Sequence, residues 1–124
     1  MNLVDSSAWL EYFSDGKNAA RFAKPIQNTE ELLVPTICLY EVFKVIIRQR
    51  GEEMGLQVIT AMQQGTVIDL TSEIALQATK LSIEHKLAMA DSTILATARL
   101  YNATLWTQDK DFESLAGVHY FCKT

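Results

Sequence analysis

The stretch "MADSTILATARLYNATLWTQDKDF", residues 89–112, decides the fold that we predict for this chain. It begins with apolar residues at helical spacing, Asn102 supplies a helix stop, and "ATLWT" then has the apolar and β-branched residues of a strand. Asp109 and Asp111 follow, where the apolar strand meets polar sequence. A helix, a buried strand and acidic residues after it are typical of an α/β domain with a site beyond its strand ends.

The same alternation of strand and helix patterns extends along the whole chain. Strands are predicted at 2–5, 32–35, 66–70, 103–107 and 118–122. Helices are predicted at 6–14, 17–28, 36–50, 52–64, 72–86 and 90–101, with a short one after 111. The sequence therefore predicts an α/β fold with a mostly parallel central sheet of about five strands, flanked by helices on both faces.

The length and composition bound the class of protein. With 124 residues, of which 48% are hydrophobic and 21% charged, we expect one globular domain over 1–124. No apolar run reaches the roughly 18 residues of a membrane span. The start "MNLVDSSAWL" also lacks the pattern of a signal peptide, so we expect a cytoplasmic protein without membrane contact.

The charge and the cysteines exclude further classes. A net charge of −4 argues against a protein that coats nucleic acid through bulk positive charge, but it is compatible with a nuclease that has an acidic pocket and a local basic patch. Cys38 and Cys122 have no CxxC spacing and no histidine cluster near them. We therefore predict two buried thiols, and neither a disulfide framework nor a zinc site.

Three aspartates are placed by strand ends. Asp5 ends the first predicted strand, where it either caps the following helix or belongs to a site, and the two serines after it could also cap. Asp109 lies just beyond the fourth strand and has no local role, so we assign it to the site. Asp111 precedes "FESLAG" and is predicted to cap a short helix that begins at Phe112.

Two further acids lie on predicted helices. Glu41 is surrounded by apolar and aromatic residues, and because a buried unpaired carboxylate is costly, it must reach solvent, a cation or a metal. The simpler alternative to a site role for Glu41 is a solvated ion pair with Lys44 or Arg48, which follow it at i+3 and i+7. Asp91 lies at the head of an apolar stripe rather than on the polar face of its helix, which favours a functional role over helix capping.

Taken together, these acids predict a metal site. Like charges within about 4 to 6 Å raise one another's pKa and destabilise the fold unless a cation offsets them. Oxygen ligands alone suit Mg²⁺ or Mn²⁺ rather than Zn²⁺. Such a site supports metal-assisted hydrolysis of a phosphodiester, without a serine, cysteine or histidine nucleophile.

These residues, in this order, resemble a PIN-domain ribonuclease of the VapC toxin type. The resemblance is carried by "NLVDSSAWLEYF", "LLVPTICLYEVFK" and "MADSTILATARLYNATLWTQDKDF", which together span most of the chain. The resemblance implies a PIN-like domain that acts as a toxin by cleaving RNA with Mg²⁺ or Mn²⁺. It also implies a small cognate antitoxin that neutralises the toxin, and a homodimer. The matched positions are Asp5, Glu41, Asp91 and Asp109 for the four acids, Ser7 and Thr107 for supporting hydroxyls, and Asp111 for an auxiliary acid.

The resemblance also adds a basic element, because Lys44 and Arg48 follow Glu41 by one and two helical turns and could contact the phosphates of an RNA strand. Two alternatives remain at this point. A receiver-like phosphoacceptor domain has a similar length and an acidic Mg²⁺ pocket, but it needs paired acids after the first strand and an aspartate ending a middle strand. A non-catalytic binding module with the PIN fold would gain nothing from four mutually repelling acids.

Overall fold

The sheet of the computed structural model, which describes residues 1–123, has five strands that all run parallel. Their spatial order is β3-β2-β1-β4-β5. The strands are β1 (Asn2–Val4), β2 (Leu32–Pro35), β3 (Thr66–Ile68), β4 (Thr104–Thr107) and β5 (Val118–Tyr120). The predicted parallel sheet is therefore confirmed, with β3 and β5 ending earlier than predicted.

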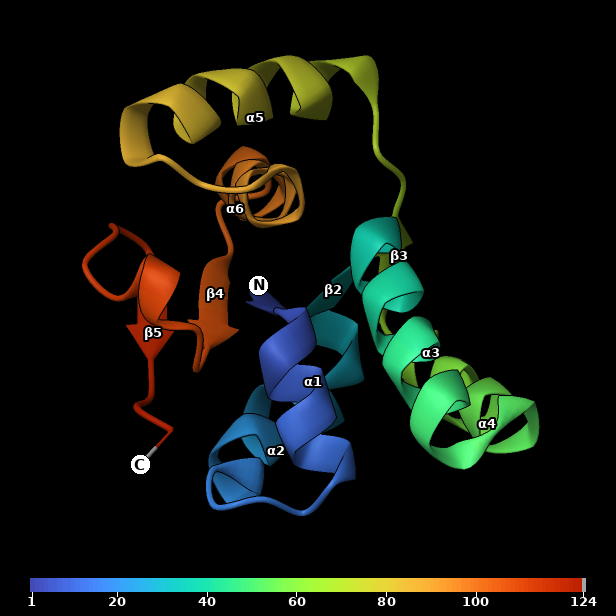
Figure 1. Ribbon diagram of the computed structural model, residues 1–124. Helices are drawn as coiled ribbons and strands as arrows, with labels where there is room; N and C mark the ends of the chain where they lie inside the picture. The colour runs from blue at the N-terminus through green and yellow to red at the C-terminus, as the bar shows by residue number, and fades with distance from the viewer. Residues whose placement is uncertain (124) are drawn as a thin grey trace.

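Helices cover the strands from both sides. They are α1 (Ser6–Phe13), α2 (Ala19–Gln27), α3 (Thr36–Arg50), α4 (Glu52–Met62), α5 (Ser72–His85) and α6 (Met89–Leu100), with 3-10 helices η1 (Thr29–Glu31) and η2 (Lys110–Phe112). Figure 1 shows α5 and α6 together on one side of the strands, α1 and α2 on the other, and the α3–α4 pair beside them. None of the described helices combines the length and apolar character that crossing a membrane requires.

The central strands are mostly apolar because they lie between the helices on the two faces of the sheet, whereas the edge strands β3 and β5 are more exposed. The central strands place Leu3, Val4, Leu33, Val34 and Leu105 in the core, each 0–1% exposed. They pair in register, with Leu3 opposite Leu33 on one side and opposite Leu105 on the other. This fixed register determines which residues leave the sheet together at its carboxyl edge.

Local signals set several helix ends. Asp5 caps α1 by accepting from the Ala8 N–H, and Thr71 caps α5 by accepting from the Ile74 N–H. Gly51, with φ +90°, ends α3 where the prediction placed the stop, and Asn102 takes the left-handed conformation just after α6, with φ 54°. Of these local signals, the Asp5 cap lies at the candidate site itself.

The strand order places the site. The chain moves from β1 through β2 to β3 and then crosses to the other side of β1, so that β1 and β4 flank the point where the direction reverses. In open parallel sheets, ligands bind in the crevice beyond the carboxyl ends of the strands at such a point. Asp5 follows β1 and Asp109 follows β4, which puts both acids at this crevice.

Two local predictions are wrong. The short helix after 111 is the 3-10 turn η2, and its cap is Asp109, which accepts from the Asp111 N–H, instead of Asp111. Asp109 takes this role because its extended backbone, with φ −82° and ψ 119°, precedes the turn. Cys38 is buried as predicted, but Cys122 is exposed and lies just after the edge strand β5.

A close backbone approach beside β3 yields a stability prediction. A Cβ at Gly65 would lie 2.8 Å from the Leu32 carbonyl oxygen and 3.0 Å from Val34 Cγ2. Gly65→Ala should therefore lower the free energy of unfolding by about 1–3 kcal/mol, measured by urea denaturation. The exposed neighbour Gln64 is the control, and Gln64→Ala should change stability by less than about 0.5 kcal/mol. Equal stability of the two variants would show that β2 moves enough to accommodate the added methyl group without cost.

Candidate metal centre

Asp5 is a buried carboxylate whose two oxygens are both hydrogen-bonded. Its Oδ1 accepts from Ser7 Oγ at 2.8 Å and from the Ala8 N–H at 3.0 Å, and its Oδ2 accepts from Thr107 Oγ1 at 2.7 Å. The side chain is 3% exposed. The sequence left capping and site membership open for Asp5, and the structure gives it the cap while placing it at the crevice beside the other acids.

Thr107 joins the two central strand ends. Its hydroxyl donates to Asp5 and accepts from the Asp109 N–H at 2.9 Å. Because Thr107 is fully buried, this bond pair is shielded from water. The two residues expected to support the acids, Ser7 and Thr107, both contact Asp5, and Thr107 also holds the backbone that carries Asp109.

Asp91, Asp109 and Asp111 form the tightest group of acids. Each offers a carboxylate oxygen, and these three oxygens lie within 4.8 Å of one another. Asp91 comes from the first turn of α6, while the other two flank Lys110 in η2. The sequence assigned Asp111 to capping with an auxiliary charge. In the structure its carboxylate belongs to the same group as the other two, although Asp111 is exposed whereas Asp91 and Asp109 are half-buried.

Glu41 reaches the site from α3. Ser6 Oγ donates to Glu41 Oε1 at 2.7 Å, across 35 residues of sequence, and so ties the start of α1 to α3. Among the residues that the structure describes, no salt bridge joins Glu41 to Lys44 or Arg48, so the ion-pair alternative is not formed. The sequence favours Ser6 only as a helix cap, because its contact with Glu41 joins residues 35 positions apart and leaves no local signal.

The electrostatics of the site show that the acids influence one another. Burial raises the pKa of Asp5 to about 6, against the opposing effect of hydrogen bonds from Thr107, Ala8 and Ser7. Burial also raises the pKa of Asp91 to about 7, with added repulsion from four carboxylates. In order of effect, these four are Asp109, Asp5, Glu41 and Asp111. The five acids therefore share one electrostatic environment.

The donor set fits a divalent cation. Within residues 1–123 the salt bridges join the N-terminus to Glu31 and Glu84 to His85, so no lysine or arginine neutralises the acids. Asp91, Asp109 and Asp111 could hold Mg²⁺ or Mn²⁺ through carboxylate oxygens, the ligand type that these hard ions prefer. Asp5, with both oxygens occupied by donors, and Glu41 could add charge from the side.

Lys44 and Arg48 lie on the exposed part of α3. Lys44 Nζ is 5.8 Å from the centre of the Tyr40 ring, and both basic residues help to line a shallow recess of about 300 Å³ with Tyr40, Phe43 and Ile47. They follow Glu41 along the same helix without pairing with it in the described part of the chain. Both side chains are exposed and positively charged, which favours contact with an anionic ligand.

Fold and site together define a class of protein, an all-parallel α/β domain whose strand switch point gathers acids of the kind that divalent cations bind. More specifically, the chain belongs to the PIN domain family, which matches residues 3–118. This confirms the family to which the sequence motifs pointed. It excludes the receiver alternative, whose strand order is 2-1-3-4-5 rather than 3-2-1-4-5.

Similar solved structures share this fold over nearly their full length. A toxin–antitoxin complex from Klebsiella pneumoniae contains a chain 26% identical to this one, with a TM-score of 0.82 over 96% of each chain. The Mycobacterium tuberculosis sarcin-ricin loop cleaving toxin VapC20 is 15% identical, with a TM-score of 0.77 over 94% of this chain and 95% of its own. DNA-bound VapBC from Salmonella typhimurium is 16% identical, with a TM-score of 0.75 over 100% of both chains. The comparison with curated proteins gives no match.

The raised pKa of Asp91 predicts how stability depends on pH. A carboxyl group whose pKa rises from 3.8 to about 7 on folding binds more protons in the folded state, so its contribution to stability is lost as pH rises through this window. In Asp91→Asn the side chain cannot ionise, so the variant does not lose this stability as pH rises. The metal-free variant should therefore be more stable than the wild type at pH 8, with a difference that shrinks towards pH 4, measured by urea denaturation in EDTA.

The control for this prediction is Asp69→Asn, because Asp69 is an exposed acid after β3. Its stability relative to the wild type should not change between the two pH values. A wild type that is more stable than Asp91→Asn at pH 8 in EDTA would contradict the repulsion inferred at the site.

Proposed function

We propose that this protein is a metal-dependent endoribonuclease toxin of the VapC type, which hydrolyses RNA phosphodiester bonds with Mg²⁺ or Mn²⁺. The observation that carries the proposal is the gathering of Asp91, Asp109 and Asp111 within 4.8 Å, beside Asp5 and Glu41, in a PIN domain. The description of VapC20 as a toxin that cleaves the sarcin-ricin loop supports RNA as the substrate class.

The five acids divide into two groups in this proposal. Asp91, Asp109 and Asp111 would hold the divalent ion through their neighbouring carboxylate oxygens. When bound, the ion would supply an activated water as nucleophile and Lewis-acid stabilisation of charge on the phosphate. Asp5, oriented by Ser7 and Thr107, would add negative charge beside the ion. Glu41 on α3, which accepts a hydrogen bond from Ser6, would add negative charge as well.

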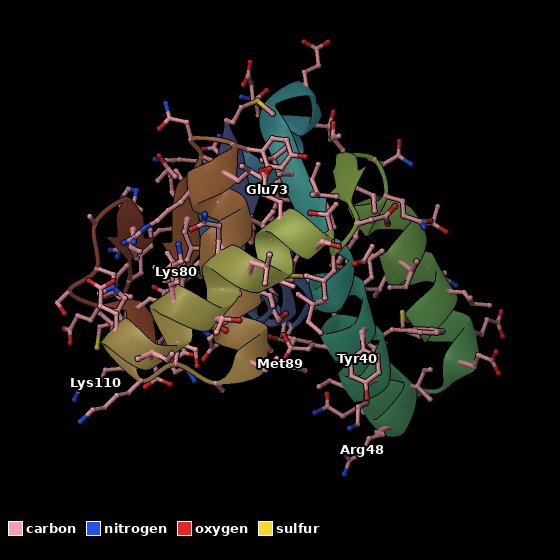
Figure 2. All side chains as sticks on the ribbon, turned by 90° about the horizontal axis from the view of Figure 1, so that it is seen from above. Tyr40, Arg48, Glu73, Lys80, Met89 and Lys110 are labelled. Atoms are coloured by element: carbon pink, nitrogen blue, oxygen red, sulfur yellow. The ribbon has the colours of Figure 1, made fainter. Side chains whose placement is uncertain are left out.

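The RNA strand would be held by basic residues on both sides of the acids. Arg48 and Lys110 lie at opposite ends of one edge of the molecule, with Met89 and Tyr40 between them (Figure 2). Met89 opens the helix that carries Asp91, and Lys110 lies between Asp109 and Asp111, so this edge borders the site. We assign Lys44 and Arg48 to phosphate contacts, which position the strand without reading its sequence.

A protein partner is also part of the proposal. The structural neighbours from Klebsiella pneumoniae and Salmonella typhimurium are toxin–antitoxin assemblies, and we propose a cognate antitoxin that neutralises this chain and a homodimer as its assembly. A short neighbouring reading frame that encodes a DNA-binding protein would support the assignment. Cytoplasmic location follows from the same proposal, since RNA and antitoxin are both found there.

The central prediction concerns cleavage. Purified protein free of antitoxin, incubated with a single-stranded RNA and an RNA stem-loop, should cut internally in Mn²⁺ or Mg²⁺ and lose activity in excess EDTA. Asp91→Asn and Asp109→Asn should each reduce the rate at least 100-fold, because they remove ligand charge; an asparagine in place of Asp109 can still cap η2. Asp111→Asn should also lose activity, whereas the exposed control Asp69→Asn should not.

Different results would point elsewhere. Cleavage that persists in excess EDTA or in Asp91→Asn would contradict the metal-dependent mechanism. A well-folded protein that binds RNA without cutting any probe would favour the non-catalytic binding module.

The basic residues predict a salt dependence. Lys44→Ala and Arg48→Ala should each weaken binding of a single-stranded RNA to the inactive Asp91→Asn protein and reduce the slope of log affinity against log salt by about 0.7, the expectation for one lost contact with a single strand. Fluorescence anisotropy at several salt concentrations measures both quantities. Lys80 on α5 is the control, and Lys80→Ala should leave the slope unchanged. Slopes of Lys44→Ala and Arg48→Ala that both match that of the Asp91→Asn parent would remove α3 from the RNA path.

A further inference from the structure

Asn18 uses its side chain in an unexpected way. It precedes α2, where asparagine normally caps, yet its side chain makes no cap hydrogen bond. Its Nδ2 donates instead to Gln108 Oε1 at 3.1 Å and to the Cys122 carbonyl at 2.9 Å. Because the side chain is only 2% exposed, both amide hydrogens are used within the protein and away from water.

The residue that Asn18 holds lies between two members of the site. Gln108 follows Thr107, whose hydroxyl bonds Asp5, and precedes Asp109. Its side chain is 7% exposed, and it meets Asn18 across 90 residues of sequence. The segment between β4 and η2 is therefore fixed at two successive residues, by the Thr107 hydroxyl and by the Gln108 side chain.

This segment must be held in place because its two acids, Asp109 and Asp111, lie close to a third acid, Asp91. Asp111 lies in η2, a 3-10 turn of three residues, and Asp109 caps this turn. A turn this short has little internal stability of its own. Their carboxylates repel that of Asp91, with oxygens within 4.8 Å. Without an anchor, the repulsion would move the turn away from α6 and spread the ligands before a metal ion arrived.

We propose that Asn18 is a positioning residue for the metal centre: by holding Gln108, its carboxamide sets where Asp109 and Asp111 stand relative to Asp91. The inference rests on the proposed function, because it assigns the contact a role in metal binding. A purely structural tie would stabilise the domain without affecting the affinity for metal beyond its effect on folding. Partners that orient metal ligands typically change affinity by about 10–100-fold when removed.

The test measures Mn²⁺ binding without RNA. Isothermal titration calorimetry at pH 8 compares the wild type with Asn18→Ala, Gln108→Ala and the double variant, at a temperature where circular dichroism shows all of them folded. Each single variant should bind Mn²⁺ about 10-fold more weakly, and the double variant should be no weaker than the worse single one, because both remove the same contact. Gln108→Ala tests the contact from the other side if Asn18→Ala fails to fold.

The matched control is Thr71→Ala, which also removes a side-chain hydrogen bond to the backbone, but at the start of α5. Its Mn²⁺ affinity should stay within twofold of the wild type. A second readout needs no metal: amide hydrogen exchange in EDTA should speed up over residues 109–112 in Asn18→Ala and not in Thr71→Ala.

The outcomes separate the two proposals. A wild type that binds no Mn²⁺ would overturn the proposed metal centre. A wild type that binds, together with a folded Asn18→Ala of equal affinity or unchanged exchange over 109–112, would overturn the positioning role alone. Equal weakening in Thr71→Ala would also overturn it, because the effect would then follow general destabilisation.

Discussion

The hydrogen bond from the Thr107 hydroxyl to Asp5 Oδ2, at 2.7 Å, joins residues 102 positions apart in sequence. It is available only because β1 pairs in parallel with β4, which brings both strand ends to one edge of the sheet. Everything else at the site depends on this pairing. Ser7 and Ala8 complete the bonding of Asp5, Asp109 is held from the same threonine, and α6 delivers Asp91 to the side of the pair.

The acids are tolerated at a cost to the metal-free protein. Burial and repulsion raise the pKa of Asp5 and of Asp91, so both carboxyl groups are harder to ionise in the folded state than in the unfolded state. A domain with this arrangement gives up stability at neutral pH to keep ligand charge concentrated. Hydrogen bonds from Thr107, Ser7 and the Ala8 N–H offset part of that cost at Asp5 and also fix the orientation of its carboxylate.

Sequence reasoning located the parts that depend on periodicity and strand ends. Asp5 and Asp109 were placed by the ends of apolar strands, and Asp91 by its position at the head of an apolar helical stripe. It failed at Asp111, because the 3-10 turn begins at Lys110, two residues before the predicted start at Phe112, so that Asp109 is the cap. Sequence patterns do not define helix ends to within one or two residues. It also could not find the Ser6–Glu41 and Asn18–Gln108 contacts, since each joins side chains that only the tertiary fold brings together.

The strand order has a consequence for synthesis on the ribosome. β1 is made first but takes its place in the middle of the sheet, and its partner β4 is made about a hundred residues later. At translation rates of about 5–20 residues per second, some 5–20 s separate Asp5 from Asp109. During this interval no nascent chain can assemble the acidic cluster, even if its earlier helices have already folded. The complete cluster is thus absent from every truncated product that stops before η2, and it forms only when β4 has paired with β1 and η2 has reached the site.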